Sequence, residues 1–355
     1  MNVHAIQQEV LTLLPAHKKS NGKWISFNAV CCQHNGETPD TRRRGGVLPN
    51  PDGSLSYHCF NCNFKTGFYP GRPMSFKFRK LLKWMGVDEN TIQRLTMEAL
   101  RIKEFTPVHE VVKAPEVEIT FKPRPLPDDS ASFKEWMTML GLTDDDYVVP
   151  LQLTQAVDYI LSRHINIDKY DFYITDDSSY NLDKRVIVPF TWKNKIIGYT
   201  ARAMTDGIKP KYHNSHEPNY VFNVDKQLPD AKFVLVVEGP FDAMSIDGVA
   251  ILGSDISETQ VDIIESLGRD VIVVPDFDVH IDKRGLKVWP GRNLIDRAIE
   301  YGWSVSFPMW AEQYKDSAKA VQELGKLFVI KSILDARETS ALKIELRAKA
   351  IYNKL

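Results

Sequence analysis

The chain has 355 residues, of which 43% are hydrophobic and 26% are charged. This is the composition of an ordinary globular protein, so it excludes a largely disordered or fibrous chain, and the length suits two or three domains. No apolar run approaches the ~20 residues that a membrane span needs, and the first residues lack the layout of a signal peptide. We therefore expect a soluble protein of the cytoplasm without membrane contact.

Charge is distributed unevenly along the chain. The 45 basic and 46 acidic residues nearly cancel, yet the segment between Lys18 and Lys83 holds twelve Lys or Arg residues against three acids. The remainder is correspondingly acidic. This asymmetry indicates a module that binds a polyanion, attached to a more acidic body.

The first third of the chain predicts a small module followed by a linker. Residues 1–19 have the apolar spacing of an amphipathic helix. Residues 20–70 are loop-rich and too poor in apolar side chains for a sizeable core, so they need a bound metal or a covalent cross-link to hold them together. Residues 76–104 repeat apolar side chains at helical spacing. Five prolines between Thr106 and Pro127 remove donors and block helix formation, which predicts a semi-extended linker and a domain boundary.

After the linker, helices are followed by a hairpin and then by strands that alternate with helices. Residues 131–180 are expected to be mostly helical, residues 186–200 to form a β-hairpin, and residues 318–355 to be helical. In between, short apolar strands alternate with helices of about ten residues, which predicts βαβ units and a parallel sheet. The expected strands are Phe233–Val237, Val249–Leu252, Val271–Val274 and Val305–Phe307, and the expected helices are Phe241–Ile246, Glu258–Leu267 and Leu294–Tyr301.

All four cysteines lie in one short segment, which favours a metal site in a reducing compartment over disulfides or free thiols. Two residues separate Cys31 from His34, and two separate Cys59 from Cys62. This is the spacing of a zinc ribbon, in which four protein ligands enclose a structural, tetrahedral Zn²⁺. Two neighbours could replace a ligand at one or two positions: Cys32 and His58.

Basic and aromatic side chains surround these cysteines. The run Arg42, Arg43, Arg44 has no acidic partners around it in the sequence, which favours contact with phosphates over a solvated face. Exposed aromatic rings could stack on unpaired bases, although for any single ring a place in a small core beside the zinc is the favoured interpretation. The aromatic residues are Trp24, Phe27, Tyr57, Phe60, Phe64 and Phe68.

Four carboxylates follow two of the expected parallel strands. Glu238 directly follows the first of these strands, and Asp242 comes one helical turn later. Asp276 and Asp278 follow a second strand and alternate, so that both can face the same way. Open parallel sheets bind ligands at the carboxyl ends of their strands, where unpaired acids repel one another unless a divalent cation joins them. The sequence therefore predicts a magnesium site, with ordinary loop acids as the alternative.

A second basic segment precedes these acids. Residues 183–212 hold seven Lys or Arg residues against two acids, among them Arg202, Lys209 and Lys211. Cations that bind phosphates, beside a carboxylate cluster that binds metal ions, are what phosphoryl transfer requires. Solvated charges of a hairpin are the alternative for some of these residues.

Two of the motifs resemble known signatures. The sequence Glu-Gly-Pro-Phe-Asp at 238–242, with Asp-Phe-Asp at 276–278, resembles the Toprim signature that primases, topoisomerases and some nucleases share. The sequences Cys-Cys-Gln-His at 31–34 and Tyr-His-Cys-Phe-Asn-Cys at 57–62 resemble the zinc domain of bacterial and bacteriophage DNA primases.

The basic segment adds to this resemblance. The runs Lys-Arg-Val-Ile-Val-Pro-Phe at 184–190, Ile-Gly-Tyr-Thr-Ala-Arg at 197–202 and Pro-Lys-Tyr-His-Asn-Ser at 210–215 resemble the basic polymerase subdomain of these primases. The order of zinc module, linker and core is also that of the family. The resemblance covers about residues 25–330 and is closest to the T-even type of bacteriophage primase.

The resemblance implies a DNA primase, an RNA polymerase that makes short RNA primers on single-stranded DNA by two-metal nucleotidyl transfer from NTPs. The acids that it assigns to Mg²⁺ or Mn²⁺ are Glu238, Asp276 and Asp278, with Asp242 and Asp316 as further candidates. Arg202 and Lys211 match basic residues that hold primer, template or nucleotide. The chain departs from the family at Ala318, where a second acid is usual, and at Cys32, where proline is usual, so the choice between Cys31 and Cys32 as zinc ligand stays open.

The expected fold is α/β, with a mostly parallel Toprim-type sheet in a polymerase core that follows a small zinc-ribbon β domain. The expected domains are a zinc-ribbon template-binding domain at 1–75, a helical segment with Pro-rich linker at 76–130, the basic N-terminal part of the RNA polymerase core at 131–230, a Toprim catalytic domain at 231–330 and a helical C-terminal tail at 331–355.

Several partners are expected. These are a single-stranded DNA template, NTPs, a hexameric replicative helicase and a single-strand DNA-binding protein. The helicase is expected on a separate chain, because no Gly-x-x-x-x-Gly-Lys-Ser/Thr loop occurs, and the tail is its candidate contact unless it simply caps the core.

Two rival functions stay open at this point. One is a Toprim nuclease or topoisomerase subunit that would use Tyr199 or Tyr212 as a nucleophile. The other is a non-catalytic zinc-ribbon protein that binds single-stranded DNA.

Overall fold

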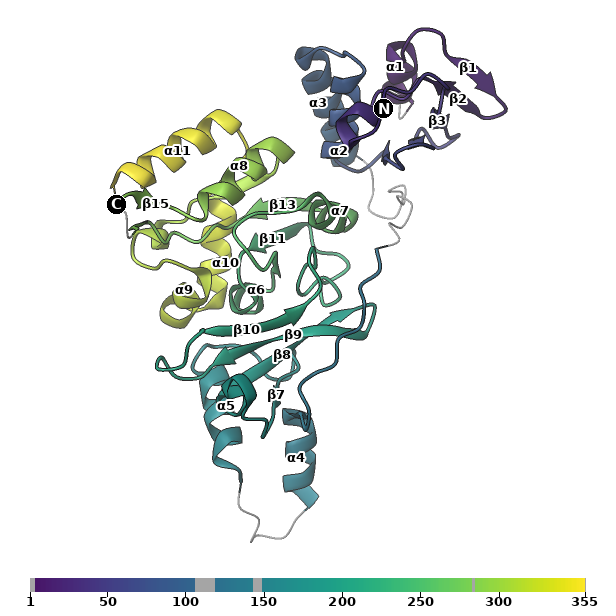
Figure 1. Cartoon of the computed structure of the whole chain (residues 1–355). Coiled ribbons are helices and arrows are strands. Elements are labelled where there is room, and N and C mark those ends of the chain that lie inside the picture. Colours follow the sequence, from purple (N-terminus) through teal and green to yellow (C-terminus); the bar gives the residue numbers. More distant parts are fainter. Residues whose placement is uncertain (1–3, 106–118, 143–148, 283–284, 355) are drawn as a thin grey trace. The chain divides into compact units, whose positions relative to one another are not determined.

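The computed structural model describes residues 4–105, 119–142, 149–282 and 285–354. The chain forms two compact units, Met1–Val117 and Glu118–Leu355 (Figure 1). The division between them falls inside the predicted linker, whose residues 106–118 lie outside the described ones.

The N-terminal unit is built on a five-stranded antiparallel sheet in which each strand pairs with the next along the chain. Its strands are β1 (Lys19–Asn21), β2 (Trp24–Phe27), β3 (Gly45–Pro49), β4 (Leu55–Cys59) and β5 (Lys65–Phe68), and its helices are α1 (Ala5–Leu13), α2 (Phe76–Trp84), α3 (Glu89–Phe105) and the 3₁₀ helix η1 (Cys32–Asn35). Both segments predicted to be helical contain helices, although α1 ends at Leu13 and Lys19 already belongs to β1. The helical segment 76–104 is divided near Gly86, whose φ of 83° lies in the left-handed region that favours glycine.

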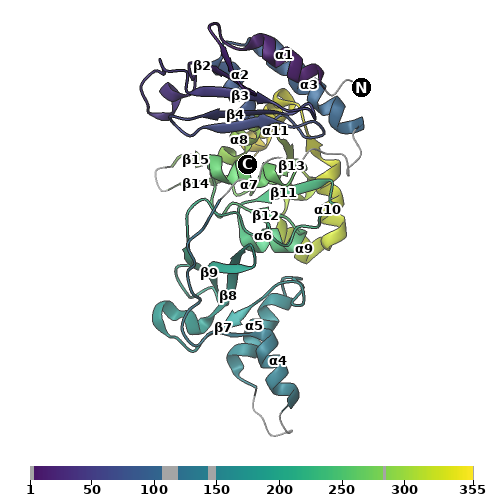
Figure 2. The same cartoon turned by 90° about the vertical axis from the view of Figure 1, so that its right-hand side faces the viewer.

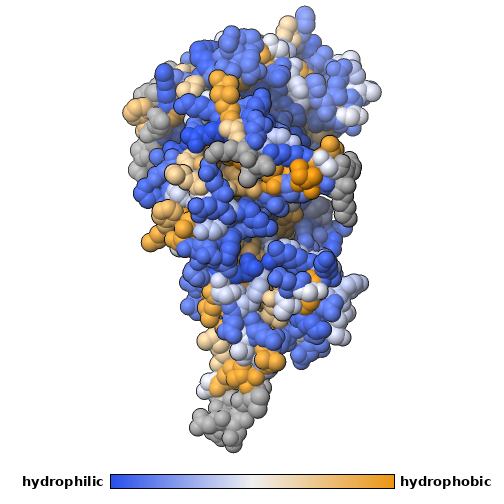
Figure 3. Space-filling model, turned by 90° about the vertical axis from the view of Figure 1, so that its left-hand side faces the viewer, coloured by the Kyte–Doolittle hydropathy of each residue, from blue (hydrophilic) through white to orange (hydrophobic). Residues whose placement is uncertain are grey.

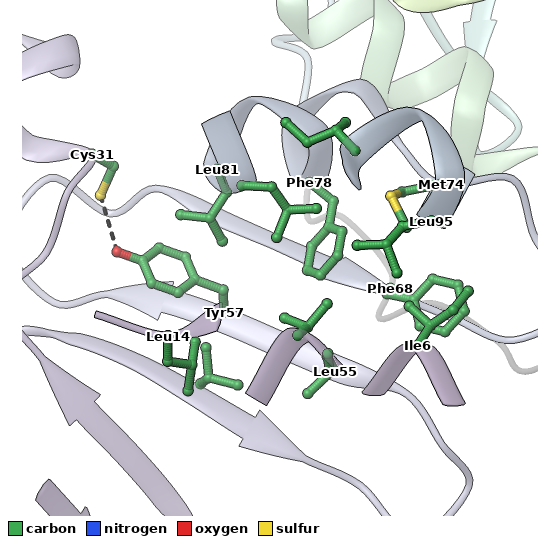
Figure 4. Close-up of a cluster of buried hydrophobic side chains, with 14 of the residues drawn as sticks. Ile6, Leu14, Cys31, Leu55, Tyr57, Phe68, Met74, Phe78, Leu81 and Leu95 are labelled. Carbon is green, nitrogen blue, oxygen red and sulfur yellow. Dashed lines mark hydrogen bonds between the residues drawn. The ribbon is translucent and has the colours of Figure 1, made fainter. Parts of the chain in front are cut away.

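Side chains from the sheet and the helices form one hydrophobic core in this unit. Figure 4 shows Leu55 and Phe68 of the sheet close to Phe78 of α2, with Ile6 of α1 beside them. Residues 20–70 do not build this core alone, as their low apolar content predicts, because α1, α2 and α3 of the same unit supply much of it.

The C-terminal unit begins with an antiparallel sheet of five strands in the order β10-β9-β8-β7-β6. The strands are β6 (Ala131–Ser132), β7 (Tyr173–Ile174), β8 (Arg185–Trp192), β9 (Lys195–Ala203) and β10 (Tyr212–His216), and the helices are α4 (Phe133–Leu142), α5 (Leu151–Leu161) and the short 3₁₀ segment η3 (Ser179–Lys184). The predicted hairpin is confirmed as β8 and β9. Its turn places Lys193 and Asn194 at φ of 50° and 62°, as tight hairpin turns require. The stretch 131–180 is less helical than predicted, because residues beyond Ser162 form loops and β7.

The described end of the predicted linker packs on this antiparallel sheet. The indole N–H of Trp192 donates to the carbonyl of Ile119 at 3.0 Å. The ring of Phe121 meets the rings of Trp192 and Tyr220 edge-on, at centroid distances of 5.2 and 5.6 Å. Residues from Ile119 onward therefore belong to the C-terminal unit.

A second sheet of the C-terminal unit has the order β12-β11-β13-β16-β17. Its first four strands are parallel, as predicted, and β17 adds an unpredicted antiparallel edge. The strands are β11 (Phe233–Val237), β12 (Val249–Ala250), β13 (Asp270–Val273), β16 (Ser304–Ser306) and β17 (Arg337–Glu338), with a separate hairpin of β14 (His280–Ile281) and β15 (Lys287–Val288). The helices are α6 (Pro240–Ile246), α7 (Glu258–Ser266), α8 (Arg292–Tyr301), α9 (Ser317–Leu324), α10 (Lys326–Asp335), α11 (Ala341–Lys354) and the 3₁₀ helix η4 (Met309–Glu312).

Helices cover both faces of the parallel sheet. Helices α6 and α9 lie on the face toward the antiparallel sheet, and α7 and α8 lie on the opposite face (Figures 1 and 2). The predicted fold class is thus confirmed: a mostly parallel α/β sheet follows a small β domain that contains the cysteines. Within the described ranges, no helix combines the length and apolarity of a membrane span.

Helices lie at both ends of the C-terminal unit. Apolar side chains gather at the end formed by α4 and α5 (Figure 3), where Met137 and Leu151 are exposed.

The C-terminal helix α11 packs on the rest of its unit, because Arg292 pairs with Glu345 and the hydroxyl of Tyr352 donates to the carbonyl of Lys287. The tail therefore caps the core, and its contact with a helicase stays a prediction.

Candidate functional site

The four cysteines come together in the N-terminal unit. Cys31 and Cys32 lie at the start of η1, Cys59 ends β4, and Cys62 lies in the turn after it. Their sulfur atoms all lie within 4.8 Å of one another. The Sγ atoms of Cys31 and Cys62 are 3.5 Å apart, and those of Cys32 and Cys59 are 3.6 Å apart.

These distances fit a tetrahedral zinc ion. Four sulfurs at about 2.3 Å from a common centre stand roughly 3.8 Å from one another. A disulfide needs a sulfur separation of about 2.05 Å, so the four cysteines are not paired as disulfides. Burial raises the pKa of the Cys31 thiol and raises that of Cys32 to about 11. Without a cation both thiols therefore stay protonated at neutral pH, and a bound metal would convert them to thiolates.

His34 differs from its predicted place. It is outside the sulfur cluster, and its ring stacks on Trp84 with centroids 4.5 Å apart and planes 3° from parallel. Cys32 takes the place in the cluster that the spacing assigned to His34. The side-chain amides of Asn35 and Asn61 donate to the sulfurs of Cys62 and Cys32, each at 3.5 Å, which is the support that metal-binding sulfurs commonly receive.

The arginine run is organised by a buried acid. The carboxylate of Asp40 accepts the backbone N–H groups of Ala29, Arg42 and Arg44, and it pairs with the Arg44 guanidinium at 3.1 Å. These hydrogen bonds outweigh burial and hold the pKa of Asp40 below its usual value. The prediction that no acid partners the run is therefore wrong for Arg44. Among the described residues, the side chains of Arg42 and Arg43 show no ion pair.

One outer face of the N-terminal sheet presents aromatic rings. The rings of Trp24 and Phe60 meet edge-on at 6.0 Å, and that of His58 lies 4.2 Å from Phe60, which is 62% exposed. Trp24 lies over Gly46, where an added Cβ would approach its ring to 2.9 Å. We call Trp24, His58 and Phe60 the aromatic face. The core interpretation is confirmed for the buried Phe27, Tyr57 and Phe68.

In the C-terminal unit, the parallel register brings two of the predicted acids together. Glu238 follows β11 and Asp276 lies shortly after β13, and the strands pair with Val236 opposite Val273. The backbone N–H of Asp276 donates to Oε1 of Glu238 at 3.2 Å. Gly291 borders both residues, since an added Cβ would lie 3.1 Å from Oε1 of Glu238 and 2.5 Å from the carbonyl oxygen of Asp276.

Burial and mutual repulsion dominate the electrostatics of these acids. Burial, with the charges of Asp242 and Asp278, raises the pKa of Glu238 to about 7. Burial, with Asp242 and Glu238, raises the pKa of Asp276 to about 9. Asp278 is exposed, and none of the three predicted ligands has an ion pair within the described part of the chain. Oxygen donors without a cation partner suit Mg²⁺ or Mn²⁺, so the residues fit the predicted metal.

The two further candidate acids lie next to these. The segment before α9 is tied to the strand end, because the backbone N–H of Phe277 donates to the carbonyl of Lys315 at 2.6 Å. Asp316 caps α9 by accepting the N–H of Lys319 at 2.7 Å. Asp242 is buried in the first turn of α6. We call Glu238, Asp276, Asp278 and Asp316 the carboxylate edge.

Two of the predicted cations, Arg202 and Lys211, lie close together, and Lys211 lies near Asp316. Arg202 is only 6% exposed, donates from Nε to the hydroxyl of Tyr159 at 2.8 Å, and lies 4.5 Å over the ring of Tyr212. Burial and the charges of Arg202, Lys315 and Arg163 lower the pKa of Lys211. Lys209 is exposed in the turn before it.

A further cation at this place is Arg163, which follows α5 and was not predicted from the sequence. Its guanidinium lies 4.6 Å over the ring of Tyr159 and 5.5 Å over that of Phe241, and its Nε is buried without a hydrogen-bond partner. A lone arginine near the end of a helix gives no sequence signal, and only the fold brings it beside Arg202. We call Arg163, Arg202, Lys211 and Lys315 the cation cluster. None of the four has an ion pair among the described residues.

Arg185 supports the turn that presents two of these lysines. It is fully buried, and its guanidinium donates to the carbonyls of Pro210 at 2.8 Å and Lys211 at 3.3 Å. Further donations to the carbonyls of Tyr180 and Ala201 satisfy the buried charge. Arg185 therefore fixes the backbone of the Lys209–Lys211 turn, while the side chains of Lys209 and Lys211 stay exposed.

No protein-family model and no curated protein matches this chain. Solved structures that resemble it include the RNA polymerase domain of Mycobacterium tuberculosis primase DnaG, with 16% identity and a TM-score of 0.42 over 56% of this chain and 81% of that one. The zinc-binding and RNA polymerase domains of Aquifex aeolicus primase give 16% identity and 0.42 over 94% and 83% of the two chains. The E. coli primase catalytic core gives 17% and 0.42 over 56% and 79%. At these identities and TM-scores, the similarity assigns neither a family nor an activity to this chain.

Proposed function

We propose that this chain is a DNA primase, which synthesises short RNA primers on single-stranded DNA from NTPs. The observation that supports this proposal best is the position of the cation cluster beside the carboxylate edge. The charges of Lys315 and Asp316 lie close enough to both Lys211 and Asp276 to shift the pKa of each. Unpaired cations next to unpaired carboxylates suit a ligand that carries both phosphates and divalent metal ions, as NTPs do.

The chain's own residues then have distinct tasks. The guanidinium groups of Arg163 and Arg202, held on the rings of Tyr159 and Tyr212, would bind phosphate oxygens with little loss of side-chain freedom. Lys211 and Lys315 would neutralise phosphate charge as it develops. These cations would orient the incoming nucleotide toward the strand ends.

Glu238, Asp276 and Asp278 would hold Mg²⁺ or Mn²⁺, with Asp316 as a further candidate. When bound, such ions lower the pKa of an attacking 3′-hydroxyl and stabilise the leaving pyrophosphate. Base pairing with the template, rather than any side chain, would then select the nucleotide that is added.

The N-terminal unit would bind the template. Rings of the aromatic face can stack on unpaired bases, and Arg42 and Arg43 can contact phosphates. Cys31, Cys32, Cys59 and Cys62 would hold a structural Zn²⁺ with no open position for chemistry. A replicative helicase and a single-strand DNA-binding protein remain proposed partners.

The rival functions receive less support from the geometry. A topoisomerase-type tyrosine must reach a phosphate, yet Tyr199 is 8% exposed and Tyr212 packs beneath Arg202 and against Phe241. Burial raises the pKa of both hydroxyls, which weakens them as nucleophiles. A binding protein without catalysis would have no need for buried, unpaired acids at the carboxylate edge.

Incorporation of labelled NTPs on single-stranded DNA with Mg²⁺ tests this function. The wild type should give short, template-dependent RNA, and Asp276→Ala should lose about 10³-fold or more of the rate, because metal-assisted stabilisation of the transition state is lost. Asp335→Ala is the matched control, since Asp335 is an exposed acid that pairs with Lys331 on the same helix.

Two outcomes would contradict the proposal. DNA cleavage in the absence of NTPs would favour a nuclease. Tight binding of single-stranded DNA without any incorporation, over many templates, would favour a binding protein.

A further inference from the structure

Asp242 is the most deeply buried acid near the carboxylate edge, at 8% exposure. Its Oδ1 accepts the backbone N–H of Ala318 at 2.9 Å and the hydroxyl of Ser317 at 3.3 Å. Its Oδ2 faces Gly239, where an added Cβ would lie only 2.8 Å from the oxygen. One carboxylate oxygen is therefore already hydrogen-bonded by the protein, and the other lies against the backbone of Gly239.

The donors that Asp242 binds belong to the start of α9. The first N–H groups of a helix have no partner inside the helix and attract negative charge. Asp316 accepts one of them, from Lys319, and Asp242 accepts another, from Ala318. Two acids from distant parts of the chain thus share the N-terminus of one helix.

The same segment is anchored a second time. The N–H of Phe277 donates to the carbonyl of Lys315, and Phe277 stands between Asp276 and Asp278. Residues 315–318 are therefore fixed to α6 through Asp242 and to the end of β13 through Phe277. Lys315 and Asp316, which belong to the cation cluster and the carboxylate edge, lie in the anchored segment.

We infer that Asp242 is a positioning residue, which acts through Ser317 and Ala318 to hold Lys315 and Asp316 beside Asp276, and that it is not a metal ligand. This inference rests on the proposed function, because the groups that it positions belong to the proposed site. A positioning role needs an acceptor oxygen at this place, whereas a metal ligand needs the negative charge.

Four variants separate these roles. Asp242→Asn keeps an acceptor oxygen and removes the charge, and Asp242→Ala removes both. Ser317→Ala removes one of the two donors and serves if Asp242→Ala does not fold. Glu238→Gln is the reference for loss of a metal ligand.

Two measurements on the full chain give the test. Binding of Mn²⁺ alone is followed by the electron paramagnetic resonance of the free ion. Asp242→Asn should bind Mn²⁺ within about threefold of the wild type, whereas Glu238→Gln should bind it about tenfold or more weakly. Amide hydrogen exchange in residues 315–324 should rise about tenfold in Asp242→Ala, and less in Ser317→Ala, but should stay near the wild-type rate in Asp242→Asn.

A kinetic readout adds to these. Asp242→Ala should raise KM for NTP, because Lys315 is no longer held in place, and Asp242→Asn should rescue most of that loss.

The inference is overturned if Asp242→Asn weakens Mn²⁺ binding as much as Glu238→Gln does, or if Asp242→Ala leaves exchange at the start of α9 unchanged. A wild type that binds no Mn²⁺ would instead remove the metal site from the proposed function. The exchange measurement would still decide, by itself, whether Asp242 holds the start of α9.

Discussion

In the N-terminal unit, four sulfur atoms lie within 4.8 Å of one another, whereas the carboxylates of Glu238, Asp276 and Asp278 form no such group in the part of the chain that the structure describes. The sulfurs belong to buried or half-buried side chains fixed by short turns. The acids follow separate strands of a sheet, and Asp278 reaches solvent.

Electrostatics explains this difference. Neutral thiols tolerate close approach, so four of them can be packed together before a metal is bound. Ionised carboxylates repel one another strongly at short range, and burial adds to the cost. A structural metal site is closed by its four ligands, whereas a catalytic one needs space for substrate. The compact sulfur site therefore suits a structural role, and the less compact carboxylate edge suits chemistry.

Replacing Cys32 would have the largest effect on the sulfur site. Cys32→Ser should weaken zinc binding by about 100-fold or more, since one of four soft ligands is lost. The measurement is competition with a colorimetric chelator, together with the absorption of the Co²⁺-substituted protein.

His34→Ala is the control for this prediction, and it should keep its zinc affinity within about threefold, because the ring stacks on Trp84. The opposite result, in which His34→Ala loses zinc and Cys32→Ser retains it, would contradict this prediction. The zinc ligand would then be His34, as the spacing predicts, and not Cys32.

Arg163 tests whether the carboxylate edge works together with cations. Arg163→Ala should raise KM for NTP by about tenfold, because an unpaired guanidinium beside the phosphates is lost. Arg163→Lys should be intermediate, since lysine cannot stack on Tyr159 in the same way. Arg347→Ala, which breaks an ion pair with Glu338 elsewhere in the unit, should leave KM unchanged. Equal KM values in all variants would exclude Arg163 from nucleotide binding.

Phe60 tests whether the N-terminal unit binds template through its aromatic face. Phe60→Ala should weaken binding of single-stranded DNA by about 1 kcal/mol, or fivefold, through lost stacking. Phe105→Ala removes another exposed ring from the same unit and should have no effect. Fluorescence anisotropy of a labelled oligonucleotide gives both affinities, and a similar loss in both variants would count against a specific stacking face.

The smallest expected effect is on stability. The pKa of Asp276 is about 9 in the folded chain and lower when unfolded, so the folded state holds a proton that the unfolded state releases. Stability therefore falls as pH rises from the ordinary range of an aspartate toward 9. In EDTA at pH 8, Asp276→Asn should raise Tm by about 2–5 °C, and the gain should shrink at pH 5.

Calorimetry at the two pH values checks this prediction. A lower Tm for Asp276→Asn at pH 8 would show that the acid stabilises the metal-free fold, which contradicts this prediction.

The sequence predicted those features that local pattern determines. Strand and helix periodicity was sufficient for the parallel sheet, and the order of the strands placed Glu238 and Asp276 at one edge. The hairpin of β8 and β9 followed from its apolar runs and from Asn194 in its turn.

Features that depend on tertiary contacts were missed. The place of Cys32 in the sulfur cluster, and of His34 outside it, depends on the backbone of η1 and on the stacking of His34 on Trp84 of α2. Arg163 follows α5, and only the tertiary fold brings its guanidinium over the ring of Phe241. The partner of Arg44 was missed because Asp40 is four residues away and folds back through its hydrogen bonds to the backbone.

The central claim, that the carboxylate edge performs metal-dependent RNA synthesis while the sulfur site only supports the fold, is tested most directly by one measurement. RNA synthesis on single-stranded DNA is followed with the zinc-loaded chain at zero and saturating Mg²⁺, with Glu238→Gln beside the wild type. RNA is expected only from the wild type with Mg²⁺, with a loss of about 10³-fold or more in Glu238→Gln. Equal RNA synthesis by Glu238→Gln, or synthesis by the wild type without added Mg²⁺, would contradict it.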